Sequence, residues 1–239
     1  MQRRCLSAKV VGLFVVAILA MVPLLAPRAV AQNADLQQKL AEAKEAAAQN
    51  KQALAQYSWQ QQQTIALKGE VKDTKLFQVH IGPDGQQQKV ELGNTPAQAP
   101  SGGRLKQHIV KKKKGELEEY GDDIRNLADQ YASPDPSKLQ QAYQQGNVMS
   151  GPSGIPGEVK IVISNYVKPD DKVTLVLRQG AIQSFEVATY LKDPTDAVNI
   201  AAQYGKLPDG TNHVSTMQIK GVSKDLLVTL QNSNYTKVM

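Results

Sequence analysis

Apolar and polar residues alternate one by one along most of residues 157–239. The alternating runs end at short turns, among them Pro169-Asp170-Asp171 and Pro208-Asp209-Gly210. A period of two predicts strands with one buried face, and Pro and Gly supply the φ values that tight turns need. We therefore expect six strands here, joined as an antiparallel meander.

A second alternating region covers residues 58–93. Phe77 and Val79 alternate with polar neighbours, Pro83-Asp84-Gly85 makes a turn, and Val90 and Leu92 continue the pattern beyond it. This region predicts three more strands. All the strands together could form one antiparallel sheet of about nine strands, a size at which sheets normally curl.

The N-terminal part of the mature chain, residues 32–57, has a helical period instead. Ala, Gln, Lys, Glu and Leu dominate it, and all of them are good helix formers. Its apolar stripe is thin and rich in alanine, so the helix needs a partner to pack on. The same spacing also fits a coiled coil, which stays open as an alternative. The stripe consists of Leu36, Leu40, Ala43, Ala47 and Leu54.

A helical insert is expected over residues 105–146, after a surface loop over residues 94–104. Gly115 and Gly121 weaken this helix and could split it. A further loop, rich in Gly and Pro, is expected over residues 146–157. The apolar positions of the insert repeat at three and four, and they are Leu117, Tyr120, Ile124, Leu127 and Tyr131.

Four consecutive lysines lie inside the insert: Lys111, Lys112, Lys113 and Lys114. One interpretation is a patch for anionic lipid head groups or nucleic acid. The other is a solvated helix face, partly neutralised by glutamates one turn later. We favour the solvated helix face.

The first 31 residues have the features of a signal peptide. Arg3, Arg4 and Lys9 precede an apolar run over residues 10–25, and Ala29 and Ala31 form an Ala-x-Ala site. Cleavage after Ala31 would deliver the protein to the periplasm or the exterior. An uncleaved anchor is the alternative, although the run is shorter than the roughly 20 residues that a membrane-spanning helix needs. We expect no stable membrane span after cleavage.

Cleavage also changes the charge of the chain. The whole sequence has 28 Lys and Arg against 22 Asp and Glu, a net charge of +6. The removed segment holds Arg3, Arg4, Lys9 and Arg28, so 28 less four leaves 24 basic residues and a net charge of +2. A chain this close to neutral has no general field for nucleic acid, so no nucleic-acid partner is expected. The only cysteine, Cys5, would also leave with the signal.

The remaining residues show no chemical motif. The three histidines His80, His108 and His213 have no second ligand at metal spacing, and no serine has the surroundings of a nucleophile. We expect no catalytic residues, no metal and no cofactor, and we predict that the protein is not an enzyme.

The predicted fold is α+β, a large curved antiparallel sheet, or half-barrel, with helices covering its concave side and a signal helix in front. Residues 32–239 would form one domain. Two segments, Tyr57-Ser58-Trp59-Gln60-Gln61 and Gly180-Ala181-Ile182-Gln183-Ser184-Phe185, are similar to segments of the periplasmic lipoprotein carriers of the Lol type. That resemblance implies a lipid or lipoprotein acyl chain as ligand.

Two functions are compatible with this fold. The first is an exported carrier that holds an apolar ligand between sheet and helices. The second is a secreted interaction or scaffold protein with a filled core and an envelope protein as its partner. The same inward side chains would be ordinary core in the second case. The candidate ligand-binding residues are Trp59, Ile65, Phe77, Val79, Ile161, Ile163, Leu175 and Phe185.

Overall fold

The computed structural model describes residues 38, 41, 45, 46, 48–96, 104–132 and 136–238, with the backbone alone for residues 94–96, 104–114, 136 and 137. The predicted signal peptide, its cleavage residues Ala29 and Ala31, and most of the predicted helix over residues 32–57 lie outside this part. The side chains of the four consecutive lysines do as well. Within the chain, Glu42–Met239 forms one compact unit.

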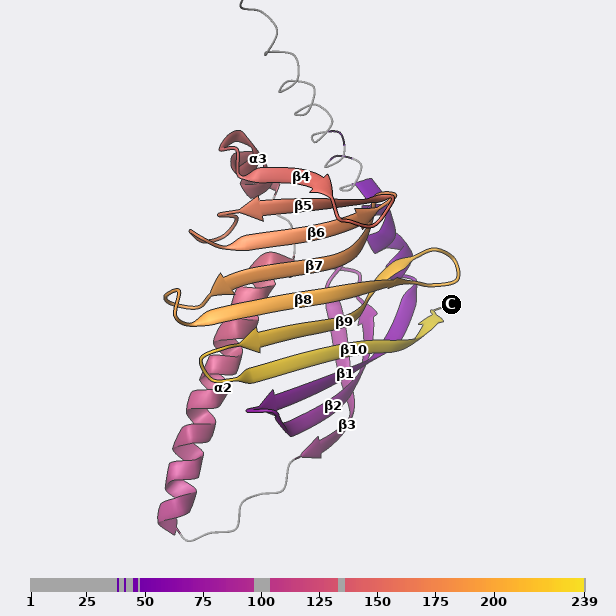
Figure 1. The fold of residues 1–239 in the computed structure, drawn as a ribbon. Coiled ribbons are helices and arrows are strands. Elements are labelled where there is room, and N and C mark those ends of the chain that lie inside the picture. The colour runs from indigo at the N-terminus through magenta and orange to yellow at the C-terminus, as the bar shows by residue number, and fades with distance from the viewer. Residues whose placement is uncertain are drawn as a thin grey trace, which may run out of the picture. The chain divides into compact units, whose positions relative to one another are not determined.

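Ten strands of this unit form a single sheet in which every neighbouring pair is antiparallel (Figure 1). Their order across the sheet is β3-β2-β1-β10-β9-β8-β7-β6-β5-β4. The sheet does not close, so β3 and β4 are its edges. The strands are β1 Tyr57–Leu67, β2 Glu70–Ile81, β3 Gln87–Pro96, β4 Val148–Pro152, β5 Glu158–Ser164, β6 Lys172–Arg178, β7 Ala181–Tyr190, β8 Ala197–Lys206, β9 Asn212–Gly221 and β10 Leu226–Lys237.

Short turns account for this connectivity. Lys68-Gly69 joins β1 to β2, and Gln179-Gly180 joins β6 to β7; all four residues have positive φ. Two successive residues with positive φ make the turn whose twist matches the twist of the strands. Glycine in the second position removes half of the steric cost. These hairpins place neighbours in the sequence next to each other in the sheet.

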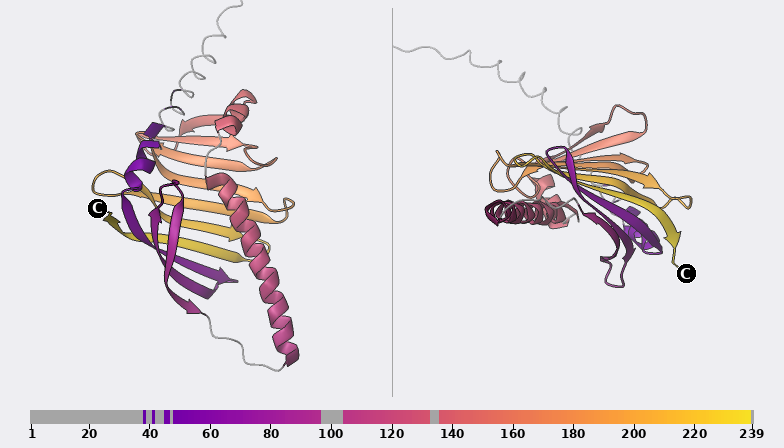
Figure 2. Two further views of the ribbon diagram at one scale, coloured as in Figure 1. Left: turned by 180° about the vertical axis from the view of Figure 1, so that it is seen from behind. Right: turned by 90° about the horizontal axis from the view of Figure 1, so that it is seen from below.

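The sheet is curved, as predicted, and helices cover its concave side. Figure 2 shows that α2, which spans Arg104–Ala132, and β3 lie on the same side of the central strands. Residues 48–54 are helical, and α3 spans Pro136–Gln144. The buried face of α2 contains Tyr120, Ile124, Leu127, Ala128 and Tyr131. Gly115 and Gly121 lie inside α2 and do not split it.

The structure corrects the predicted boundaries in two places. The predicted loop over residues 146–157 contains β4, and β3 continues to Pro96, inside the predicted loop over residues 94–104. The sheet therefore has ten strands, one more than the sequence pattern predicted. β4 contains Gly151 and Pro152, which strands disfavour. It forms because β5 offers it an unpaired edge.

Val90 and Leu92, the apolar positions of β3, do not lie on the buried face. They are 59% and 52% exposed. Register is the reason: Val79 pairs with Lys89, and an irregularity between Leu76 and Phe77 shifts the rest of β3. Lys89 and Glu91 therefore share the face that β1 and β2 bury.

Candidate functional site

One face of the sheet, here called the inner face, packs against α2. A row of directly paired residues crosses it from β5 to β9, and every one is at most 8% exposed. Apolar β-branched side chains pack well on a pleated surface, so this row forms the centre of the core. The row consists of Ile163, Val173, Val187, Ile200 and Ile219.

Two tyrosines of α2 form hydrogen bonds to turns at one end of the sheet. Tyr120 donates a hydrogen bond to Asp196 Oδ1 at 3.0 Å and lies 3.1 Å from the hydroxyl of Ser223. Tyr131 lies at the other end of the contact and bonds to Asp171. Asp196, Ser223 and Asp171 belong to three turns at the same end of the strands. α2 therefore crosses the strands instead of following them.

Asp171 is the anchor for Tyr131. Its side chain is buried and accepts hydrogen bonds from the backbone N–H groups of Tyr166, Val167 and Lys168 at 2.6 to 2.9 Å. The Tyr131 hydroxyl adds a fourth bond at 2.7 Å and lies 2.8 Å from Thr189. Burial raises the pKa of Tyr131 well above its ordinary value, so the hydroxyl stays protonated. This cluster is saturated, and its role is structural.

The opposite end of the sheet holds helical residues 48–54. Asn50 donates to the carbonyl of Asn212 at 2.7 Å and accepts from its N–H at 2.6 Å. Asn212 also donates from its side chain to the carbonyl of Ile182. These bonds tie the helix to the start of β9 and to the hairpin between β6 and β7.

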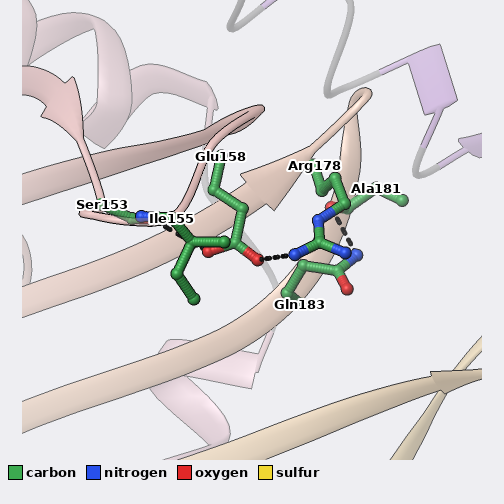
Figure 3. Close-up of polar contacts among 6 residues, drawn as sticks. All are labelled: Ser153, Ile155, Glu158, Arg178, Ala181 and Gln183. Carbon is green, nitrogen blue, oxygen red and sulfur yellow. Dashed lines mark hydrogen bonds and ion pairs between the residues drawn. The ribbon is translucent and has the colours of Figure 1, made fainter.

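Polar contacts hold the rim of the sheet at this same end (Figure 3). Glu158 at the start of β5 accepts from Arg178 at 2.8 Å and from Ser153 at 2.9 Å. Gln183 donates to the carbonyl of Ala181 at 3.3 Å. The Glu158 carboxylate thus joins the loop before β5 to the end of β6.

A second row of inner-face residues runs between α2 and helical residues 48–54. Ala202 at its centre is fully buried, but the large apolar residues on either side are only half-buried. The register places them one beside the next from β6 to β10. We call these residues the inner-face stripe: Leu175, Phe185, Met217 and Leu230.

A chain of hydrogen bonds borders the stripe on the side of β1. Lys89 Nζ donates to Gln61 Oε1 at 2.8 Å, and Gln61 Nε2 donates to Asn232 Oδ1 at 2.9 Å. Asn232 Nδ2 then donates to the carbonyl of Val214 at 2.9 Å. Gln61 is 3% exposed, and these bonds satisfy it. The chain begins at a cation that extends from β3 over the inner face.

Trp59 lies next to this chain, two residues before Gln61 in β1. Its ring is 1% exposed and stacks on Tyr235, with the ring centroids 5.5 Å apart. The indole Nε1 is buried and has no hydrogen-bond partner among the described residues. The His213 ring also packs against Tyr235, with the two ring centroids 4.3 Å apart.

All eight residues predicted to line a ligand site lie on the inner face. Four of them are at most 2% exposed and belong to the core: Trp59, Val79, Ile161 and Ile163. The other four are half-buried: Ile65, Phe77, Leu175 and Phe185. A role in ligand binding stays a prediction for each of them.

Sequence reasoning missed Met217 and Leu230, although both lie at inward positions of the predicted alternation. Ala202 pairs with Phe185 on one side and with Met217 on the other, and Met217 pairs with Leu230. These pairings bring Met217 and Leu230 into the stripe. Lys89, Gln61 and Asn232 were also missed. No pattern in the sequence singles them out, because their meeting depends on the register of three strands and on the curl of the sheet.

The outer face also has a hollow, of about 540 Å³. It is open and mostly polar, so it does not suit an apolar ligand. It also lies across the sheet from the stripe. Its lining residues are Gln60, Gln62, Leu76, Ser215, Thr216, Gln231, Asn232 and Ser233.

Within the described part of the chain, no three His, Cys, Asp or Glu residues lie close enough together to hold a metal ion. None of the helices described there is long and apolar enough to cross a membrane.

No family model matches the chain, and no curated protein sequence matches it. Among solved structures, the chain is similar to a DUF1329 family protein from Desulfovibrio piger, known from a crystal structure at 1.75 Å resolution. The two are 14% identical with a TM-score of 0.40, over 82% of this chain and 92% of the other. A likeness of this degree says nothing about a ligand or an activity.

Proposed function

We propose that this protein is an exported, non-enzymatic carrier that binds a lipid or acyl chain on the inner face of its sheet. In this proposal the signal peptide is cleaved after Ala31 and the mature chain works in the periplasm. The Lol-type resemblance of its Tyr57 and Gly180 segments supports the same class of ligand.

The observation that carries the proposal is the contrast between two neighbouring rows. The five residues of the row from β5 to β9 are 8% exposed or less, whereas the four large residues of the inner-face stripe are only half-buried. Ala202 and Ile161, which belong to the same row as the stripe, are fully buried. Both rows are apolar, and both face the side that helices cover. A chain of CH₂ groups laid along the stripe would gain about 0.8 kcal/mol for each one buried.

A binding titration tests this proposal. The sole tryptophan, Trp59, lies on the inner face and can transfer excitation energy to cis-parinaric acid, a fluorescent fatty acid, bound nearby. Saturable energy transfer is expected for the wild-type protein. Its absence would contradict the carrier.

β10 offers a matched pair of variants for the same titration. Leu230 and Leu227 are both half-buried, but Leu230 lies in the stripe and Leu227 on the outer face. Leu230→Asn should weaken probe binding about tenfold, because it places an amide against the acyl chain. Leu227→Asn should leave binding unchanged. Equal effects of the two variants would place the probe elsewhere.

The second candidate is a scaffold that binds an envelope protein, and one observation favours it. Val71, Val90 and Leu92 are 61%, 59% and 52% exposed near the β3 edge. Exposed apolar side chains beside an unpaired strand edge suit a protein partner. Absence of probe binding, together with loss of an envelope partner in Val90→Asp, would favour this function over the carrier.

A further inference from the structure

The Lys89 ammonium group is held in an unusual setting. Its only hydrogen bond to a described residue goes to Gln61, a neutral amide, and no carboxylate of a described residue forms an ion pair with it. An ammonium has three donors, so two of them are left over. A lysine with a purely structural role would gain more from a carboxylate.

Lys89 nevertheless has a fixed position. Gln61 is held by Asn232, and Asn232 is held by the carbonyl of Val214, so the three hydrogen bonds all run away from the cation. Each donor polarises the next, which favours positive charge at the beginning of the chain. Gln61 and Asn232 thus hold the ammonium group in place, and Gln61 is itself buried.

The cation faces α2 as well as the sheet. Partial burial lowers the pKa of Lys89, although the residue as a whole stays exposed, and the charge of Arg125 lowers it further. Asp129 on α2 raises it in part. Lys89 is therefore within electrostatic range of two opposite charges on α2, those of Arg125 and Asp129. A partly desolvated ammonium group that forms no ion pair with a described carboxylate is a candidate for ligand binding.

A second donor lies close by. Trp59, Val79 and Lys89 are paired across β1, β2 and β3 in one register row. The buried indole N–H of Trp59 has no acceptor among the described residues. This register row therefore places two N–H donors on the inner face, the Lys89 ammonium group and the Trp59 indole.

We infer that the inner face binds an amphiphile with an anionic head, a carboxylate or a phosphate, which Lys89 holds while the acyl chain lies along Leu230, Met217 and Phe185. This inference rests on the proposed carrier function and adds the charge of its ligand. The ammonium group would donate to the oxygens of the head.

Two probes with the same chain test it. Cis-parinaric acid carries the carboxylate, and its methyl ester does not. The wild-type protein should bind the acid about tenfold more tightly than the ester, the worth of one charge-assisted hydrogen bond. Equal affinities would overturn the inference and leave the carrier intact. If neither probe bound, both the inference and the proposed carrier function would be overturned.

Three variants assign the preference to Lys89. Lys89→Met should reduce the affinity for the acid to that for the ester, and Lys89→Arg should retain most of the preference. Lys160→Met is the matched control, since Lys160 is exposed on the outer face of β5. A preference for the acid that survives in Lys89→Met would contradict the assignment.

Competition then identifies the head group. Palmitate, lysophosphatidic acid and monopalmitoyl glycerol have a similar chain with a carboxylate, a phosphate or no charge. Displacement of bound cis-parinaric acid by palmitate alone supports a carboxylate head, and displacement by lysophosphatidic acid alone supports a phosphate head. Displacement by both anions, ahead of the neutral lipid, supports a site for either. Equal displacement by all three would overturn the inference.

Discussion

The hydroxyl of Tyr131 in α2 donates a hydrogen bond of 2.7 Å to Asp171, the residue that organises the turn between β5 and β6. Asp171 is 1% exposed and already accepts three backbone N–H groups. The bond therefore joins the covering helix to a rigid point of the sheet. It holds the C-terminal end of α2 against the turn between β5 and β6.

Tyr131→Phe should destabilise the protein by about 1–3 kcal/mol, because it removes a buried hydrogen bond to a carboxylate. Urea unfolding followed by circular dichroism measures the change. Tyr204→Phe is the control, since Tyr204 is half-buried and no described residue bonds to its hydroxyl. Equal losses for the two variants would show that the bond to Asp171 contributes nothing.

Gly221 allows Tyr120 to approach the end of β9. A Cβ atom at this position would lie 2.5 Å from the Tyr120 hydroxyl and 2.6 Å from its ring. Gly221→Ala should push α2 away from the sheet and cost about 1–3 kcal/mol of stability. Gly151→Ala in edge strand β4 has open space around it and should not destabilise the protein. A stable Gly221→Ala variant would mean that α2 does not pack as described.

The lowered pKa of Asp209 predicts that the stability of the protein depends on pH. The hydrogen bond from Tyr57, at 2.5 Å, and those from Thr211 hold the pKa of this carboxyl well below its ordinary value. A lowered pKa in the folded state adds stability at any pH above the unfolded value of about 3.9. That contribution declines as the pH falls toward the folded-state pKa.

Asp209→Asn should therefore be less stable than the wild type at pH 7, and the difference should shrink between pH 5 and pH 3. Urea unfolding at these three pH values measures it. Glu186→Gln, an exposed change on the outer face of β7, controls for the loss of one negative charge. A difference that stayed constant down to pH 3 would contradict the lowered pKa.

The proposed signal peptide can be tested by the mass of the protein recovered from the host. Cleavage after Ala31 leaves a chain that begins at Gln32. Ala31→Phe puts a bulky side chain where the peptidase needs a small one, so the precursor should accumulate. Val30→Leu keeps both small residues and should be processed normally. An unprocessed wild-type protein would favour the uncleaved anchor.

Much of the fold can be predicted from the sequence. Alternation and turn residues predicted nine of the ten strands, and the 3.6-residue period predicted α2 and its buried face. These features are local, because side-chain period and turn chemistry act over a few residues. β4 escaped prediction because its pairing with β5, and not its own composition, makes it a strand.

The site can be predicted from the sequence only in part. Parity of position predicted that all eight candidate residues share one face of the sheet, since neighbours in a strand point to opposite sides. Parity does not say how deeply each residue is buried: Ile161 and Ile163 are at most 2% exposed, whereas Leu175 is half-buried. The chain from Lys89 through Gln61 to Asn232 depends on long-range register, which no local pattern contains.

Native mass spectrometry of the protein purified from the envelope of its host, followed by extraction and analysis of any bound lipid, would decide whether the protein is a lipid carrier. We expect a complex heavier than the mature chain by the mass of a lipid, and recovery of that lipid in the extract. We also expect Leu230→Asn to lower the occupied fraction and Leu227→Asn to leave it unchanged. Protein recovered only without ligand, and unable to take up cis-parinaric acid, would contradict the carrier.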